Sequence, residues 1–144
     1  MTDVKSNYCI DMNRIFSVGM SAGAIMSNAL GCFRGDVLRG IAPSSGMYWN
    51  NTCTGDVAVM VICGTQDTFN PCDDASNGAL SETNVWAPKN GCTTQSVAST
   101  TYSGCSEFQG CRANDPLLLC VHSGGHGWPT AGNDWAWSFF MSLN

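Results

Sequence analysis

Apolar residues gather in four short runs along the chain, separated by stretches rich in glycine, serine and asparagine. The clearest run, Val-Ala-Val-Met-Val-Ile-Cys over residues 57–63, is apolar throughout, as expected of a strand covered on both faces of a parallel sheet. Three more runs predict strands over residues 15–18, 38–43 and 117–121, and helix-compatible segments follow or separate them, over residues 22–31, 78–87 and 133–143. The alternation predicts an α/β fold with a mostly parallel sheet and flanking helices.

The segments between these elements are shorter and more polar. Residues 2–8 have the pattern of the end of a helix, and Gly31 is expected to cap the helix over 22–31. Residues 90–115 form a cysteine-bearing excursion with one further strand near 96–102. The loop over residues 44–55 contains a glycosylation sequon, Asn50-Asn51-Thr52, a motif of low specificity. In the last helix, four aromatic side chains are expected to pack against the sheet: Trp135, Trp137, Phe139 and Phe140.

The length and the charge of the chain limit the number of domains and the classes of binding partner that we expect. We expect residues 1–144 to form a single domain, large enough to bury a core. Only 12% of the residues are charged, and the net charge is −5. An acidic chain with few Lys and Arg is a poor partner for nucleic acid or for an anionic membrane. No apolar run approaches the length of a bilayer span.

The chain contains nine cysteines but no Cys-x-x-Cys pair that would suggest a zinc site. A disulfide framework is the better interpretation, and it indicates a secreted, extracellular protein. The N-terminus carries no signal peptide, however, and an odd number of cysteines leaves at least one without an internal partner. These observations agree if Met1 is an internal methionine and the chain is the C-terminal part of a longer secreted protein.

One motif has a direct chemical meaning. Gly19-Met-Ser-Ala-Gly23 follows the first expected strand and opens a helix, which is the Gly-x-Ser-x-Gly pattern of a nucleophile elbow. A serine raised on such a sharp turn has close neighbours, so side chains at Gly19 and Gly23 are expected to collide with them. The turn also aims the backbone N–H of Ala22 at the reacting centre, where it can stabilise an oxyanion. The alternative is an ordinary Gly/Ser-rich turn between a strand and a helix.

Two more polar side chains follow strands of the expected sheet. Asp67 comes just after the strand over 57–63, and His126 just after the strand over 117–121. Reactive groups gather at the carboxyl ends of parallel strands, and the chain order Ser21, Asp67, His126 is that of the α/β-hydrolases. In such an arrangement His126 accepts the Ser21 proton and Asp67 orients the ring. Ser21 then attacks an ester carbonyl, and water later releases the acyl group.

Each of these assignments has a competitor. Asp67 could serve only as a turn former, and Asp73 and Asp74 are alternative acids that lie further from the strand end. His122 is the alternative base, but it lies within or beside the last strand, where we expect it to have a supporting role.

With these motifs, the sequence resembles secreted esterases of the feruloyl esterase and polyhydroxybutyrate depolymerase group over nearly its whole length. The resemblance implies the C-terminal part of an α/β-hydrolase fold, with a nucleophile, acid and base at Ser21, Asp67 and His126. It also implies hydrolysis of feruloyl or related esters on plant cell-wall xylan. The matching segments are Ile10-Asp-Met-Asn-Arg-Ile-Phe16, Gly19-Met-Ser-Ala-Gly23, Ile41-Ala-Pro-Ser-Ser-Gly46, Gly64-Thr-Gln-Asp67, Asn90-Gly-Cys92, Phe108-Gln-Gly-Cys111 and Gly124-Gly-His-Gly-Trp-Pro129.

The sequence departs from this group in two respects. Cys63 stands where the group often has histidine, and the N-terminal segment that carries the first strands and the second oxyanion donor is absent. The Ala22 N–H is then the one evident donor, and loss of such a donor typically costs about 10²–10³ in kcat. We therefore expect the chain alone to be weakly active or inactive. We also expect the strand over 15–18 to expose an apolar edge.

Disulfide pairing does not follow from spacing alone. We expect Cys105 to pair with Cys111, Cys92 to pair with Cys120, and Cys63, within a buried strand, to be a free thiol.

Three functions remain open for comparison with the structure. The first is a feruloyl esterase-like serine esterase that acts on a small aromatic ester or on cell-wall polysaccharide. The second is a polyhydroxyalkanoate depolymerase or acetyl xylan esterase with the same three residues, and the third is an inactive truncated hydrolase that acts as a binding or structural module. Tyr48, Trp49 and Trp128 are candidates to contact substrate, or else aromatic residues that pack the loops. No motif suggests a metal or another cofactor.

Overall fold

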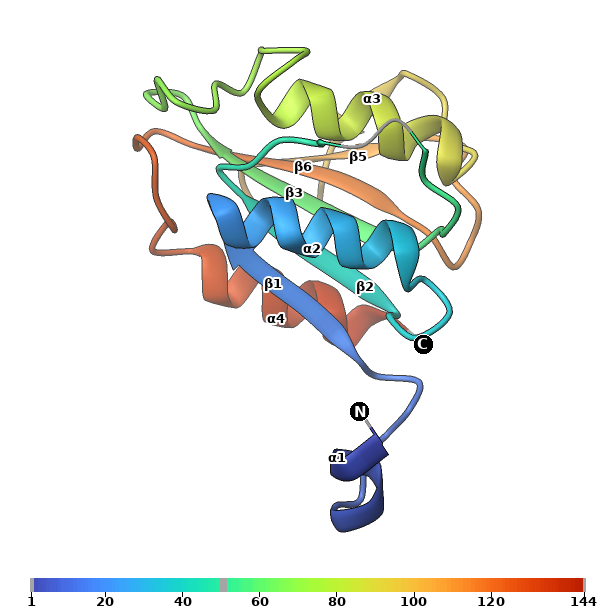
Figure 1. Ribbon diagram of the computed structural model, residues 1–144. Coiled ribbons are helices and arrows are strands. Elements are labelled where there is room, and N and C mark those ends of the chain that lie inside the picture. Colours follow the sequence, from blue (N-terminus) through green and yellow to red (C-terminus); the bar gives the residue numbers. More distant parts are fainter. Residues whose placement is uncertain (1, 50–51, 144) are drawn as a thin grey trace.

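A six-stranded sheet with the strand order β1-β2-β3-β6-β5-β4 forms the centre of the molecule (Figure 1). The computed structural model describes residues 2–49 and 52–143. The strands are β1 (Phe16–Met20), β2 (Gly40–Ser44), β3 (Ala58–Gly64), β4 (Ser96–Ala98), β5 (Cys105–Phe108) and β6 (Leu117–His122). The helices are α1 (Thr2–Asn7), α2 (Ala22–Phe33), α3 (Ala79–Lys89) and α4 (Gly132–Ser142).

Four neighbouring strands, β1, β2, β3 and β6, run parallel. Their register pairs Met20 with Ser44, Ser44 with Ile62, and Gly64 with His122. The carboxyl ends of all four strands therefore lie along one edge of the sheet, and the loops that leave them start side by side. The predicted fold class, a mostly parallel sheet with flanking helices, is confirmed.

The uniform hydrophobicity of β3 results from burial of both of its faces. Val59, Val61 and Cys63 belong to the core cluster that also holds Trp86 of α3. The alternate residues of β3 belong to a second cluster, with Phe139 and Phe140 of α4. Because successive side chains of a strand point to opposite faces, every position of β3 must be apolar. In Figure 1, α2 and α3 cover one face of the sheet and α4 covers the other.

The sequence predicts a single strand near residues 96–102, whereas the structure has β4 and also β5, which pairs antiparallel with both β4 and β6. The residues of β5 are Cys-Ser-Glu-Phe, and only the first is buried. A half-exposed strand of this composition has no apolar pattern that would reveal it.

Gly31 does not cap a helix. Helix α2 continues to Phe33, and a Cβ at position 31 would lie 3.0–3.1 Å from side-chain atoms of Ile41 and Val57. The glycine instead allows the helix to lie close to the sheet.

The disulfides differ from the expected pairs. The structure contains Cys63–Cys72, Cys92–Cys111 and Cys105–Cys120, so both predicted pairs are wrong and Cys63 is not a free thiol. Cys105 and Cys120 are direct neighbours in the register of β5 and β6, a pairing that becomes visible only once β5 is known. Cys63, at the end of β3, reaches Cys72 across the loop that follows the strand.

Two exposed regions lie at the edge of the sheet and at the N-terminus. Strand β1 forms one outer edge, and Val18 is 54% exposed there, as expected for an apolar edge. Helix α1 projects away from the sheet (Figure 1). Within residues 2–49 and 52–143, no helix is both long enough and apolar enough to cross a bilayer. Asn50 and Asn51 of the sequon lie outside the described residues.

Candidate active site

Ser21 lies in the sharp turn between β1 and α2. Its φ is 56° and its ψ is −119°, a conformation that L-residues rarely adopt. The backbone N–H of Ser21 donates to the carbonyl of Ser44 at 3.0 Å, which ties the turn to the end of β2. The sequence therefore forms a strained strand–turn–helix corner, as the elbow motif predicts.

The two glycines of the motif are not equivalent. A Cβ at position 19 would lie 2.3 Å from the carbonyl carbon and oxygen of Gly23, so only glycine fits there. A Cβ at position 23 would meet nothing within 4 Å. The expected collision is confirmed for Gly19 and is wrong for Gly23.

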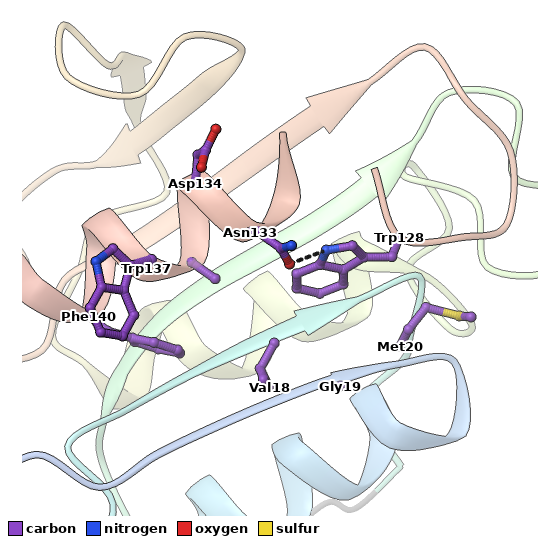
Figure 2. A pocket seen from close by; sticks show the side chains of 9 residues that line it. Val18, Gly19, Met20, Trp128, Asn133, Asp134, Trp137 and Phe140 are labelled. Carbon is purple, nitrogen blue, oxygen red and sulfur yellow. Dashed lines mark hydrogen bonds between the residues drawn. The ribbon is translucent and has the colours of Figure 1, made fainter. Parts of the chain in front are cut away.

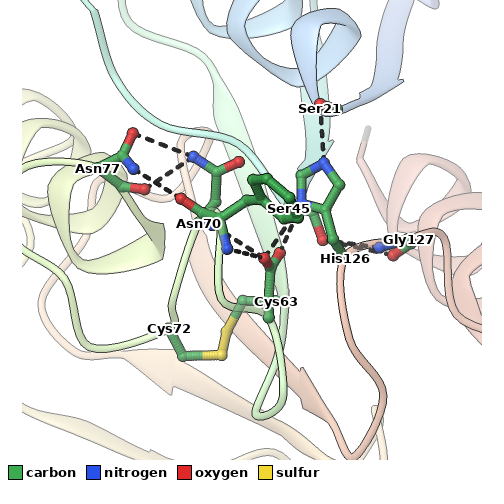
Figure 3. Close-up of polar contacts among 10 residues, drawn as sticks. Ser21, Ser45, Cys63, Asn70, Cys72, Asn77, His126 and Gly127 are labelled. Atoms are coloured by element: carbon green, nitrogen blue, oxygen red, sulfur yellow. Dashed lines mark hydrogen bonds and ion pairs between the residues drawn. A yellow bond between two sulfur atoms is a disulfide. The ribbon is translucent and has the colours of Figure 1, made fainter.

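The structure brings together the side chains of Ser21, His126 and Asp67. Figure 3 shows the contact between Ser21 and His126. Nε2 of His126 lies 2.9 Å from Oγ of Ser21, and Nδ1 lies 2.9 Å from Oδ2 of Asp67. An ionised carboxylate can only accept hydrogen bonds, so Nδ1 carries the proton and Nε2 is free to accept from the serine hydroxyl. The arrangement can remove a proton from Ser21 and hold the resulting imidazolium against a fixed negative charge.

The environment of Asp67 keeps its carboxyl ionised. Burial by itself would raise the pKa of Asp67. The backbone N–H groups of Asn70 and Phe69 each donate to Oδ1 at 2.9 Å, and His126 donates to the carboxylate as well. These hydrogen bonds outweigh the effect of burial and hold the pKa of Asp67 below its ordinary value.

The loop that carries Asp67 is fastened at both ends (Figure 3). The disulfide Cys63–Cys72 joins its start to its end. Within the loop, the Asn70 side chain donates to the carbonyl of Asn77 at 2.8 Å, and the Asn77 side chain donates to the carbonyl of Phe69 at 2.6 Å. These contacts fix the segment whose backbone N–H groups, at Phe69 and Asn70, donate to the Asp67 carboxylate.

Ser45 is a site residue whose role no sequence motif identifies. It has a φ of 49° at the carboxyl end of β2, and its N–H donates to Ile62 at 2.9 Å. Its Oγ lies 3.4 Å from the N–H of Gly127, next to His126, and a hydrogen bond from Ser45 also lowers the pKa of Asp67. Ser45 thus links the acid to the loop of the base. The available signal was its place in a segment shared with the resembling esterases.

Phe69 is a second site residue that no sequence motif identifies. Its ring lies 5.3 Å from the His126 ring, at an interplanar angle of 56°, and its side chain is 70% exposed. It therefore covers part of the imidazole from the solvent side. Only its position two residues after Asp67 could have indicated this.

The alternative acid and base have other contacts. Nδ1 of His122 accepts a hydrogen bond from the N–H of Gly124 at 3.1 Å, within the loop that leads to His126. Asp74 accepts from the N–H groups of Ser76 and Asn77 at 2.7 and 3.0 Å. Both residues shape loops, and none of these contacts involves Ser21.

The three aromatic candidates have different surroundings. Tyr48 is buried and packs edge-on against Trp86, so it fills the core and does not line an open cleft. Trp49 is 75% exposed and lines neither of the two hollows beside the site. Trp128 lines both hollows, and its Nε1 donates to Asn133 at 3.0 Å (Figure 2).

One of the two hollows has a volume of about 670 Å³ and is bounded by β1 and α4. It reaches the site through Met20, which precedes Ser21, and through Trp128, which follows His126 by two residues. Its walls are mainly apolar, with Val18 and Phe140 among them (Figure 2). The site therefore borders an open surface that suits apolar groups.

Ala22 occupies the first position of α2. The first N–H groups of an α-helix have no partner within the helix, so the N–H of Ala22 is available beside Ser21. Among the residues that the structure describes, no group of three or more His, Cys, Asp or Glu side chains could hold a metal ion.

Comparison with known sequences reveals esterase relatives. The chain is 32% identical over 149 residues to the probable feruloyl esterase C of Aspergillus terreus, which covers 95% of this chain and 53% of that protein. It is 28% identical over 147 residues to feruloyl esterase B of Piromyces equi, which covers 86% of this chain and 27% of that protein. The chain thus spans about half or less of the length of these curated relatives. No protein-family profile matches it.

Solved structures show the same fold. The chain superposes on esterase PE8 with a TM-score of 0.68 and 17% identity, over 99% of this chain and 56% of that one. It superposes on the acetyl xylan esterase from Aspergillus awamori with a TM-score of 0.65 and 15% identity, over 97% of this chain and 64% of that one. The fold is that of the α/β-hydrolase esterases, and the resemblance to feruloyl esterases is confirmed by the sequence relatives.

Proposed function

We propose that residues 1–144 form a single catalytic domain that carries the nucleophile, base and acid of a serine ester hydrolase, at Ser21, His126 and Asp67. The observation that carries this proposal is the unbroken chain of hydrogen bonds from Ser21 through His126 to Asp67. The strained turn under Ser21 and the lowered pKa of Asp67 support it, because both features serve this chemistry.

In this mechanism His126 accepts the Ser21 proton through Nε2 while Oγ attacks the ester carbonyl. Asp67 keeps the ring in the required tautomer and stabilises the imidazolium. The N–H of Ala22 stabilises the negative charge that develops on the carbonyl oxygen. The imidazolium then protonates the leaving alcohol, and a water molecule, activated by the same base, releases the acyl group from Ser21.

The sequence relatives support an assignment of the substrate class. Proteins named feruloyl esterase match most of this chain, so we assign it to aromatic acyl esters on plant cell-wall polysaccharide. Trp128 lies at the meeting point of the two hollows and is the candidate contact for the acyl ring. Three disulfides support secretion, because such bonds persist in oxidising compartments.

A fluorophosphonate probe tests the proposed chemistry without requiring rapid turnover. We expect one probe per chain, mapped to Ser21 by peptide mass spectrometry, no labelling in Ser21→Ala, and labelling at least about 100-fold slower in His126→Ala. Folded chain that leaves Ser21 unlabelled would support the alternative of an inactive module. For the acyl group, initial rates on methyl ferulate, acetylated xylan and a hydroxybutyrate polymer should be compared after subtraction of the Ser21→Ala rate. Preference for either of the last two would contradict the feruloyl assignment.

A further inference from the structure

Two cysteines outside the three disulfides lie in the same part of the core. Cys32, in the last turn of α2, is 0% exposed, and Cys53, in the loop before β3, is 8% exposed. Both belong to the core cluster between the sheet and the helices α2 and α3. The third free cysteine, Cys9, is exposed near the N-terminus.

The loop around Cys53 wraps the end of α2. The Cys32 carbonyl accepts hydrogen bonds from the N–H of Gly55 at 2.7 Å and from the Thr54 hydroxyl at 3.5 Å. The Cys32 sulfur lies 3.7 Å from the carbonyl of Thr52. The neighbours of Cys53 on both sides therefore touch Cys32, and both cysteines lie in the same buried cluster as Tyr48.

We propose that Cys32 and Cys53 form a fourth disulfide when the protein folds in an oxidising compartment. The reaction is a two-electron oxidation, and a small-molecule or protein disulfide is the oxidant. The thiolate of one cysteine attacks that disulfide, forms a mixed disulfide and releases one thiol. The second cysteine, as thiolate, then attacks the sulfur of the first, which closes the Cys32–Cys53 bond and releases the second thiol of the oxidant.

The burial of Cys53 determines the stage of folding at which this exchange can take place. Burial raises the pKa of the Cys53 thiol to about 11, so the folded protein holds almost no thiolate there. The exchange therefore precedes closure of the 52–55 loop over α2. Once formed, the bond is shielded from reducing thiols by the same burial.

The bond would have a structural consequence for the site. It would fasten the C-terminal end of α2, the helix that starts at the elbow, to the segment that connects β2 to β3. It would also account for the odd number of cysteines, because four disulfides leave Cys9 alone. This inference does not depend on the proposed esterase function.

A thiol count tests it on chain recovered from a secretory host, or refolded with oxidised and reduced glutathione. The protein is unfolded in denaturant at mildly acidic pH and treated with N-ethylmaleimide without reduction. We expect one adduct, at Cys9, and none in Cys9→Ser. Non-reducing digestion should yield one linked peptide pair that contains Cys32 and Cys53.

Three adducts per chain, or a linkage of either residue to Cys9, would overturn the proposal. A single variant, Cys32→Ser, provides the matched control, because it should expose Cys53 to the reagent and raise the count from one to two. Thermal unfolding is the second readout. The Cys32→Ser/Cys53→Ser variant should unfold several degrees below the wild type under oxidising conditions, and both should unfold alike after full reduction.

Discussion

Nδ1 of His126 lies 2.9 Å from a carboxylate of Asp67 whose side chain is completely shielded from solvent, whereas the His126 side chain is 24% exposed. The acid is fixed inside the protein, and the base remains reachable from outside. A buried acceptor fixes the tautomer of the imidazole, and an open Nε2 side lets a substrate approach Ser21. This asymmetry is what an acyl-transfer site requires.

Asp67→Asn should slow probe labelling of Ser21 by about 10⁴-fold without unfolding the protein. The backbone donors of Phe69 and Asn70 both aim at Oδ1, so the amide oxygen of the new side chain must take that place. The NH₂ group then faces Nδ1 of His126 and forces the proton onto Nε2, where it blocks acceptance from Ser21. The measurement is the second-order labelling rate.

Asp74→Asn is the matched control for that variant. Asp74 also accepts two backbone N–H groups, from Ser76 and Asn77, but it has no hydrogen bond to His126. Ser21 of the Asp74→Asn variant should therefore be labelled by the probe at the wild-type rate. Equal losses in the two variants would mean that Asp67 serves only as a turn former.

Gly19→Ala and Gly23→Ala should behave differently although both alter the same motif. A methyl group at position 19 would come within 2.3 Å of the Gly23 backbone, so the turn must open and labelling should fall by at least about 100-fold. A methyl group at position 23 meets nothing within 4 Å and should leave the labelling rate within a few-fold of wild type. Circular dichroism verifies folding. Similar rates for both variants would contradict the elbow geometry.

Replacing both Cys63 and Cys72 by serine should reduce labelling and stability together. The bond closes a loop of about ten residues around Asp67, and its removal should cost about 2–3 kcal/mol of unfolding free energy. The labelling rate of the folded fraction should also fall, because the donors to Asp67 lose their anchor. A Cys92→Ser/Cys111→Ser variant removes a disulfide outside the site and should lose stability only. A normal labelling rate in the folded Cys63/Cys72 variant would contradict a positioning role for that bond.

Because of the titration of Glu82, the free energy of unfolding should fall as the pH rises from about 4.5 to about 8. Burial raises the pKa of the Glu82 carboxyl to about 8. Neither carboxyl oxygen accepts a hydrogen bond from the described residues. A folded-state pKa above the unfolded value of 4.5 gives stability that is complete below 4.5 and is lost as the pH rises toward 8.

Glu82→Gln removes this titration. Urea unfolding at pH 5, 6, 7 and 8 should show a slope for the wild type that is steeper by up to about 1.4 kcal/mol per pH unit than the slope for the variant. Glu107→Gln, at a half-exposed position of β5, is the control for the loss of one carboxyl group. Parallel curves for wild type and Glu82→Gln would show that Glu82 is ionised in the fold at neutral pH.

The parallel half of the fold could be predicted from the sequence because its signals are local. Four apolar runs predict its strands, and the strand ends predict where Ser21, Asp67 and His126 lie. The antiparallel half could not be predicted in this way. Strand β5 has one buried residue, and the partner of Cys105 depends on the register of β5 against β6, which is a long-range property.

The contacts around the site could not be predicted from the sequence either. Ser45 adopts a positive φ although it is not a glycine, and Phe69 contacts His126 from the loop that the Cys63–Cys72 bond closes. Tyr48 is an aromatic residue of the kind that can line a cleft. It packs instead against Trp86, on a helix that is remote in sequence. In each case the deciding contact joins segments whose proximity only the folded chain reveals.

The most direct test of the central claim is a search for the acyl-enzyme itself. The chain is mixed with 4-nitrophenyl ferulate, quenched in acid at a series of times long enough for slow acylation to be detected, and digested, and the peptides are mapped by mass. We predict a feruloyl group on Ser21 in the wild type and none in Ser21→Ala. Folded protein that carries no acyl group, or carries it at another residue, would contradict the assignment of Ser21, His126 and Asp67 as the machinery of ester hydrolysis.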